Sequence, residues 1–251
     1  MSASTNSFGT RPVVLCRDHI AHDMIADVDA WTPKHFDDSL AHPAVVAAAS
    51  FGISWSLPSV FSEPGCRLFV YVASDMDGLV TWLDSDELRE AIADGSEREA
   101  QTIGVDGEPF TGNIYAVASE RGALEADFAE GGGVFVERYE VPDALSPEFD
   151  DWFHGPHLEE IAHWPGAIRA RTWVQNRDVP ARFPYDRYTS TGNRMLTADF
   201  EPEANTGRLL EYELVWRSIA GAAAWDLRLP YARREAGQML TQRPDLAETA
   251  A

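Results

Sequence analysis

The chain has 251 residues, enough for one large domain or for two modules of about 100 to 130 residues each. Its 20 Lys and Arg residues stand against 41 Asp and Glu residues, and a formal net charge of −21 disfavours nucleic acid and anionic membranes as partners. No apolar run reaches the roughly 18 to 20 residues of a membrane span, and the polar N-terminus lacks a signal-peptide pattern, so we expect a soluble, cytoplasmic protein.

The first half of the chain has the hydrophobic patterns of a mixed unit of strands and helices. These patterns predict strands at about 12–18, 44–56, 66–74 and 113–120, and helices at about 27–42 and 76–95. The resulting order, strand, helix, strand, strand, helix, strand, is the split βαβ or ferredoxin-like pattern.

The second half repeats that order with one uncertain member. The patterns predict strands at about 133–141, 166–175 and 207–216, and helices at about 147–163 and 217–238. Only "QMLTQRPDLAETAA" follows the last helix, so a fourth strand is doubtful. An insertion at about 176–207 has two interpretations, a lid or a surface buttress, and "RMLTADF" within it is a candidate edge strand.

The two halves also match each other in sequence. "HFDDSLAHPAVVAAAS" from His35 aligns with "HLEEIAHWPGAIRART" from His157, and Trp31 or Trp152 precedes its histidine by four or five residues. We therefore interpret the chain as two diverged copies of one unit. The expected organisation is a flexible N-terminus at 1–11, repeats at 12–122 and 131–240, and a tail at 241–251.

The second copy carries a recognisable signature. "EFDDWFHGPHLEEIAHWPGAIRARTW" (148–173) resembles the signature of EthD-like proteins within the dimeric α+β barrel superfamily. That signature combines an acid-Phe-x-x-Trp-aromatic helix, a histidine, Pro-Gly and an Arg-rich strand. The resemblance implies an α+β fold in which two ferredoxin-like repeats pack their antiparallel sheets as an intrachain pseudo-dimeric barrel, with helices outside and a pocket inside.

A proline stands close before each aligned histidine. Proline is tolerated at the start of a helix but breaks its interior, so Gly155-Pro156 predicts a helix break directly before His157. Pro33 stands two residues before His35, and we expect both histidines in the first turn of a helical segment. Either both are core residues that fix a kink, or at least one faces the barrel pocket as a general acid or base.

Strand alternation predicts which charged residues face the barrel interior. In "RLLEYELVW" the apolar face should meet the helices, which directs Glu211 and Glu213 inward, and "AIRARTWVQ" places Arg169, Arg171 and Trp173 on one face. A cross-strand Arg–Glu network would result. It is either a structural ion-pair lattice or a carboxylate base beside guanidinium groups able to bind an enolate or carboxylate.

The first copy lacks such charges. Its strands "AVVAAASFGISW" and "LFVYVA" are apolar apart from Tyr71, so one side of the barrel interior should be apolar and the other ionic. Such a lining suits a mostly apolar ligand with one polar end. The candidate catalytic residues are His157, His35, Glu211 and Tyr71. The candidate substrate-binding residues are Trp31, Trp55, Trp152, Arg169, Arg171, Trp173 and Glu213.

Three functions remain open at this point. By analogy with the family, the first is a cofactor-independent enzyme that performs acid/base chemistry, a cyclisation, isomerisation, dehydration or decarboxylation, on a hydrophobic carbonyl or aromatic molecule. The second is a monooxygenase or haem-type oxidoreductase of the same superfamily. The third is a non-catalytic small-molecule-binding protein, with a homodimer as a further possibility. Cys16 and Cys66 form no metal or redox motif, so no metal site is expected.

Overall fold

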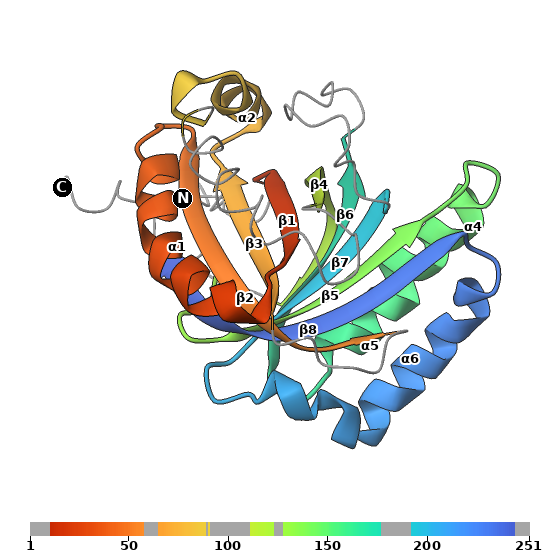
Figure 1. The fold of residues 1–251 in the computed structure, drawn as a ribbon. Coiled ribbons are helices and arrows are strands. Elements are labelled where there is room, and N and C mark those ends of the chain that lie inside the picture. Colours follow the sequence, from red (N-terminus) through yellow and green to blue (C-terminus); the bar gives the residue numbers. More distant parts are fainter. Residues whose placement is uncertain are drawn as a thin grey trace, which may run out of the picture.

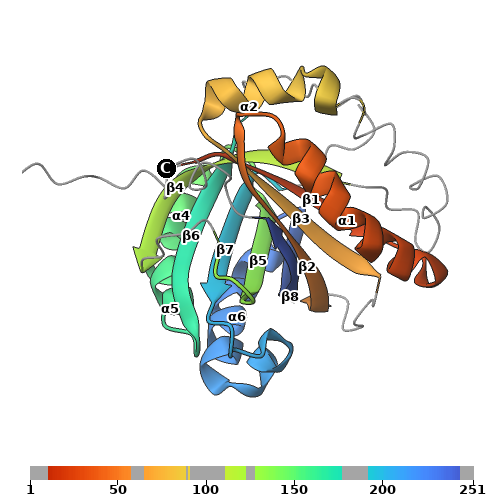
Figure 2. The same cartoon turned by 90° about the vertical axis from the view of Figure 1, so that its left-hand side faces the viewer.

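The eight described strands close into one antiparallel barrel in the order β1-β3-β2-β8-β5-β7-β6-β4. A computed structural model describes residues 11–57, 65–88, 90, 111–122, 128–176 and 192–243. Helices α1 and α2 lie against one part of the barrel wall, and α4, α5 and α6 lie against another part (Figure 1). The view in Figure 2 shows the same separation of the two helix groups.

The first half forms one ferredoxin-like unit. Its elements are β1 (Val13–His19), a 3-10 turn η2 (His22–Met24), α1 (Ile25–Leu40), β2 (Val45–Leu57), β3 (Cys66–Ala73), α2 (Met76–Leu83) and β4 (Thr111–Gly122). The strands lie in the order β4-β1-β3-β2. The predicted strands and α1 agree with this unit within a few residues, whereas α2 ends earlier than predicted and residues 91–95 lie outside the described part of the chain.

The second half has the same topology. Its elements are β5 (Gly133–Glu140), α4 (Ser146–Trp152), a π-helical turn η3 (Phe153–His157), α5 (Leu158–Ala162), β6 (Ala167–Gln175), β7 (Arg194–Phe200), a 3-10 turn η4 (Thr206–Glu211), α6 (Glu213–Asp226) and β8 (Tyr231–Arg243). The order is β8-β5-β7-β6, and the halves join through β2–β8 and β4–β6 pairing. The expected α+β fold, two ferredoxin-like units closing an intrachain barrel, is therefore confirmed.

The prediction for residues 207–240 is wrong. The expected strand at 207–216 is the η4 turn and the start of α6, and the expected helix at 217–238 overlaps β8, so the tail boundary at 241 falls inside a strand. The true third strand is β7, which lies inside the sheet rather than at an edge. A short apolar run fits either period; here Val215, Ile219 and Ala222 are buried at helical spacing.

Three apolar clusters fill the structure. One lies inside the barrel and consists almost entirely of strand residues, among them Leu15, Phe51, Leu68 and Trp173. The other two lie between the outer face of the barrel and the helices, one in each half. In α1 the buried residues Val28, Thr32, Phe36 and Leu40 recur at helical spacing, which is the pattern of a helix that covers a sheet with one face.

The two proline positions have different effects on their helices. At Gly155 the backbone has φ −108° and ψ −105°, and the helix breaks within η3, as the sequence predicted. By contrast, α1 runs from Ile25 to Leu40 with Pro33 inside it. The expectation that His35 lies in a first helical turn is therefore wrong, because this helix starts ten residues before His35.

Helices long and apolar enough to cross a membrane are absent from the part of the chain that the structure describes.

Candidate functional site

In each half, an Arg–Asp contact joins the first helix to the sheet, and a tryptophan of that helix stacks on a histidine. In the first half, Arg67 at the start of β3 donates to both carboxylate oxygens of Asp29 on α1, at 3.0 Å and 3.0 Å. Two residues further along α1, the ring of Trp31 stacks on the ring of His35, with centroids 4.4 Å apart. The bidentate Arg–carboxylate geometry fixes the helix on the sheet.

The second half contains the equivalent contacts. Arg194 at the start of β7 donates to both oxygens of Asp150 on α4, at 2.7 Å and 2.9 Å. Trp152, again two residues after the aspartate, stacks on His157 with centroids 4.2 Å apart. The histidine follows its tryptophan by five residues here and by four in α1. The π-helical turn η3 accommodates this extra residue and returns His157 to the tryptophan ring.

Both histidines face the outer surface of the barrel wall, not its interior. His35 contacts Tyr71, which alternates along β3 with the interior residues Val70 and Val72. His157 contacts Glu137, which alternates along β5 with the interior residue Val136. The prediction that one histidine faces the barrel pocket is therefore wrong. A helix that covers a sheet from outside can touch only the outward side chains of its strands.

His157 belongs to a sealed ionic network. Its Nε2 lies 2.5 Å from Glu137 Oε2, while Arg234 donates to Glu137 Oε1 at 2.8 Å and to the Tyr139 hydroxyl at 2.7 Å. Arg234 also donates to both oxygens of Asp226 at the end of α6. His157 and Glu137 are both 0% exposed. The network joins β5, β8 and two helices, and substrate has no access to this imidazole.

The charges of this network shift the protonation equilibria of its members. Burial raises the pKa of Glu137, but His157 and Arg234 outweigh it and hold the pKa below its usual value. Burial and the Glu137 charge raise the pKa of Tyr139 well above its usual value. Glu137 is therefore a buried carboxylate with two hydrogen-bonded partners, which is the condition under which a buried charge is tolerated.

His35 is less deeply buried than His157. Its Nε2 is 2.6 Å from the hydroxyl of Tyr71, and its ring is half-buried between α1 and the sheet. Aromatic rings surround the pair: Phe36 lies 5.7 Å and Trp82 lies 5.5 Å from the Tyr71 ring, centroid to centroid. The structure thus brings together three residues that the sequence suggested. His35 and Tyr71 form a pair able to exchange a proton, and Trp31 stacks on the His35 ring.

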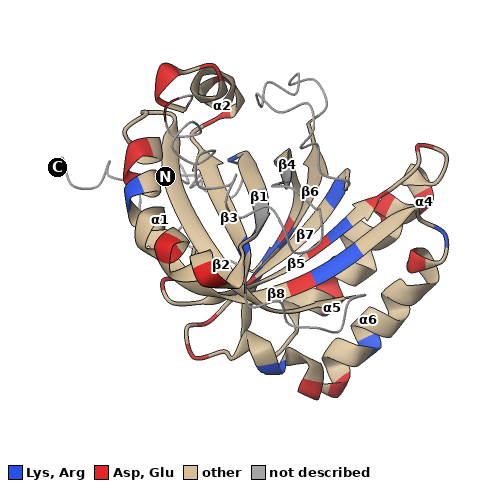
Figure 3. Ribbon diagram, in the orientation of Figure 1, with Lys and Arg blue, Asp and Glu red and all other residues tan. Residues whose placement is uncertain are grey.

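The charged residues predicted on β6 do face the barrel interior. Arg169 donates to Asp199 Oδ2 at 2.7 Å, Arg171 donates to the same oxygen at 3.4 Å, and the Arg171 guanidinium lies 4.6 Å from the Trp173 ring centroid. Arg138 and Glu235 form a second buried ion pair inside the same half. In Figure 3, charged segments mark β5, β6, β7 and β8, whereas β2 carries none. The interior is thus apolar on one side and ionic on the other.

The acids expected to complete this ionic face are elsewhere. Glu211 is exposed and pairs with Arg208, and Glu213 is exposed and pairs with Arg217 on α6. The reason is the wrong strand assignment at 207–216. Trp55, expected to bind substrate, is buried against the helices of the second half, and its Nε1 donates to the carbonyl of Thr206 at 3.0 Å.

Several important residues were not among the sequence candidates. Asp199 replaces the predicted glutamates as the acid beside Arg169, and it lies in "RMLTADF", the strand that had been assigned to the insertion. Glu120 is the β4 partner of Arg171, and its Oε2 is buried without a hydrogen-bond partner among the described residues. Glu137 was detectable in principle, since it is an acid inside the otherwise apolar run "VFVERY".

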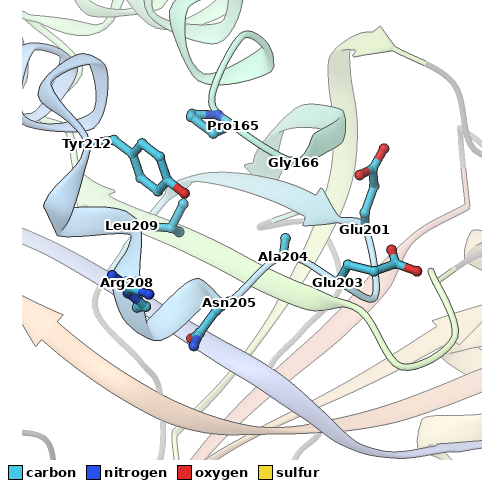
Figure 4. A pocket seen from close by; sticks show the side chains of 9 residues that line it. All are labelled: Pro165, Gly166, Glu201, Glu203, Ala204, Asn205, Arg208, Leu209 and Tyr212. Carbon is cyan, nitrogen blue, oxygen red and sulfur yellow. The ribbon is translucent and has the colours of Figure 1, made fainter.

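A surface pocket lies away from both histidines. It lies between the turn before β6 and the segment from β7 to α6, and Tyr212 and Leu209 line one side of it while Glu201 and Glu203 line the other (Figure 4). It shares no residue with the surroundings of either histidine. We therefore assign it no part in the chemistry.

Neither candidate histidine fits the role of an axial haem ligand. The Nε2 atom of His157 is held by Glu137 inside a sealed network, and the Nε2 atom of His35 is held by the Tyr71 hydroxyl. An axial ligand needs a ring nitrogen that is free to bind the iron. The Nε2 atoms of these two rings are already engaged.

Comparisons with known proteins show the fold alone. No protein-family model and no curated protein sequence matches the chain. Among solved structures, it is similar to a "putative monooxygenase" of Fusobacterium nucleatum subsp. nucleatum, with TM-score 0.58 and 9% identity over 94% of this chain and 95% of that one. It is also similar to an anthrone oxidase-like protein, with TM-score 0.58 and 12% identity over 97% and 95% of the two chains.

A third solved structure gives the same result. A "putative monooxygenase" of Lactobacillus acidophilus matches with TM-score 0.53 and 10% identity, covering 94% of this chain and 96% of that one. These matches extend over nearly the whole length of each protein, so they support one ferredoxin-like α+β barrel spanning both halves. Identities of this size do not carry an activity across.

Proposed function

We propose that the protein is an enzyme that moves a proton on a hydrophobic carbonyl or aromatic molecule, with His35 and Tyr71 as its acid/base pair. The observation that supports this proposal is the 2.6 Å contact between His35 Nε2 and the Tyr71 hydroxyl at a half-buried position. His157, the other candidate, is enclosed and tied to a buried carboxylate.

The chemistry follows from the properties of the pair. A neutral imidazole accepts a proton from an acidic C–H or O–H of the substrate, and the Tyr71 hydroxyl, hydrogen-bonded to the same ring, returns a proton at another atom. The sum is an isomerisation, or the enolisation step of a cyclisation, and it needs no outside oxidant or reductant. The rings of Trp31, Phe36 and Trp82 provide apolar surroundings that suit an aromatic substrate. We propose that the reaction uses no cofactor.

A second candidate function is oxygenation, and it rests on the solved structures described as monooxygenases or anthrone oxidase-like. The same pair would remove a proton from a methylene made acidic by a conjugated carbonyl, and the anion would react with O₂. One oxygen atom becomes a new carbonyl, and the other leaves as water with the two hydrogens of the methylene. This reaction shares its first step with the first proposal.

We further propose that the two units arose by duplication and that the chain is related to EthD-like proteins. The repeated Arg–Asp and Trp–His contacts support a common origin of the halves. On this proposal the repeats are 12–122 and 131–243, the second extending to the end of β8. A cytoplasmic location and a homodimer remain proposals of the same kind.

Hydrogen–deuterium exchange at the carbon beside the carbonyl of 2-tetralone, followed by proton NMR in D₂O, tests the acid/base pair. We expect the protein to accelerate exchange, His35→Ala to lower the rate by about 10² to 10⁴, and Tyr71→Phe to lower it by at least about tenfold. Lys34→Ala, which alters the exposed neighbour of His35, is the matched control and should keep the rate. Full activity in a folded His35→Ala variant would refute the proposal.

The same variants distinguish oxygenation. With anthrone as the probe, an oxygen electrode would record O₂ uptake and absorbance would record anthraquinone. Uptake that depends on His35 favours the second function, whereas proton exchange without uptake favours the first.

A further inference from the structure

One indole N–H differs from the other buried ones. Trp82 on α2 is 3% exposed, and its Nε1 is buried with no acceptor among the described residues. Three other buried tryptophans have partners: Trp55 donates to the carbonyl of Thr206, Trp164 to the Ser218 hydroxyl and Trp173 to the Thr197 hydroxyl, at 3.0, 3.1 and 2.9 Å. Buried tryptophan N–H groups normally find an acceptor, so this exception requires an explanation.

The position of Trp82 suggests one. Its ring centroid lies 5.5 Å from that of Tyr71, whose hydroxyl contacts His35. Three polar groups from α1, β3 and α2 thus belong to one aromatic cluster on the outer face of the first half. The same face of α2 is buried through Leu79 and Leu83, so the helix holds the indole in place.

We propose that the Trp82 N–H donates a hydrogen bond to an oxygen atom of the molecule bound beside His35 and Tyr71. This inference rests on the proposed function and narrows its substrate class. Because indole nitrogen is a donor only, the ligand atom must be an acceptor, such as a ketone, enolate or phenolate oxygen. A donor placed there stabilises the negative charge that develops on oxygen when His35 removes a proton.

The eight tryptophans give a direct spectroscopic test. In protein labelled with ¹⁵N-tryptophan, each indole N–H gives one cross-peak, and Trp82→Phe identifies its own by removing it. We expect 2-tetralone to shift the Trp82 cross-peak more than the others. Tetralin, which has the same rings without the oxygen, should leave it in place.

Binding measurements add a second readout. Trp82→Phe should raise the Kd for 2-tetralone by about tenfold and leave the Kd for tetralin unchanged. Trp216→Phe is the control, because that ring is half exposed and its N–H already donates to the carbonyl of Leu210. It should remove one cross-peak and change neither Kd.

The outcomes separate this inference from the proposed function. If 2-tetralone binds but leaves the Trp82 cross-peak unmoved, or binds Trp82→Phe as tightly as the parent, the inference is wrong and the acid/base proposal is unaffected. If the cross-peak shifts but no proton exchange occurs, Trp82 is a ligand donor in a binding site and the proposed catalysis is wrong. If neither probe binds, the carbonyl site itself is overturned.

Discussion

The histidine of the first half and that of the second half are held in the same way but in different surroundings. Each stacks on a tryptophan, and each helix is fixed by a bidentate Arg–Asp contact. In the first half the polar partner is a neutral tyrosine from β3, and the ring is half-buried. In the second half the partner is a carboxylate from β5, and the ring is fully enclosed.

The difference shows what a charged partner requires. A buried carboxylate costs several kcal/mol unless its oxygens are satisfied. Glu137 therefore accepts a hydrogen bond from Arg234, and Arg234 also donates to Asp226 and Tyr139. The second histidine is thus part of a buried structural network. A His–Tyr pair carries no such requirement and can stay open to a small molecule. On the proposed function, the first half keeps its pair for chemistry, whereas the second half uses its histidine for stability.

The largest expected effect is on stability, from His157→Ala. The change removes one of the two partners of the buried Glu137 carboxylate, leaves its Oε2 without a hydrogen bond and opens a cavity at a fully buried position, so we expect a loss of about 3 to 5 kcal/mol in the free energy of unfolding. His35→Ala should cost less, about 1.5 kcal/mol, because the hydrogen bond to the Tyr71 hydroxyl lies at a half-buried position and involves no carboxylate. Urea denaturation of both variants measures the two losses in the free energy of unfolding. Equal losses would mean that the two histidines do not differ in role.

The pH dependence of stability should come from three buried acids, Glu137 and Tyr139 in the second half and Tyr115 in β4 of the first half. The folded-state pKa of Glu137 lies below its unfolded value, so its contribution is present above about pH 4.5 and is lost as pH falls through the folded-state pKa. Tyr139 has a raised pKa, and burial raises the pKa of Tyr115 to about 12, so stability should fall from pH 10 to about 12 as the unfolded chain ionises. Each unit of pKa difference corresponds to about 1.4 kcal/mol.

Two variants separate these contributions. Glu137→Gln should flatten the acid limb of the stability profile, and Tyr139→Phe should reduce the alkaline limb while leaving that of Tyr115. Unfolding free energies measured across pH 3 to 12 would show both. An acid limb unchanged in Glu137→Gln would assign it to other carboxylates.

The Arg–Asp contacts should have equal and intermediate effects. Arg67→Ala and Arg194→Ala each remove two charge-assisted hydrogen bonds between a helix and a strand, which we expect to cost about 1.5 to 3 kcal/mol. Urea denaturation should place the two variants close together. A large gap between them would show that the two halves are fastened differently, despite the matching geometry.

The sequence predicted the matching fold of the two halves because the residues that align between them are those that make these contacts. Trp31, Trp152 and the two histidines align in the sequence, and they stack in the same way in space. Alternation placed Arg169 and Arg171 correctly because the pairing of β6 with β7 is continuous from Arg169 to Val174. The strand assignment for "RLLEYELVW" failed because Leu210, Tyr212, Leu214 and Trp216 alternate as in a strand, whereas the buried residues Val215 and Ile219 follow the helix period of α6.

The orientation of the histidines was beyond a sequence argument. A helix period shows that His157 shares a face with apolar residues, but it does not show whether the sheet surface opposite lines the barrel or covers its outside. In the structure the sheet residue that faces His157 is Glu137. The two are 20 residues apart in the chain, so their contact depends on the whole connection from β5 through α4 to η3. Only the closed barrel, with both groups of helices outside it, shows that the histidines face the outer surface of the sheet.

The smallest expected effects come from exposed ion pairs, one in a helix of each half. Lys34 pairs with Asp38 on α1, and Arg217 pairs with Glu213 on α6, each with both side chains at least 46% exposed. Alanine at Lys34 or Arg217 should lower the free energy of unfolding by no more than about 0.5 kcal/mol. Arg217→Ala should have the larger effect, because its acid precedes the base by four residues, which is the favourable orientation along a helix. Both effects should shrink in 1 M NaCl. If Lys34→Ala instead cost as much as His157→Ala, burial would not be what separates the two halves.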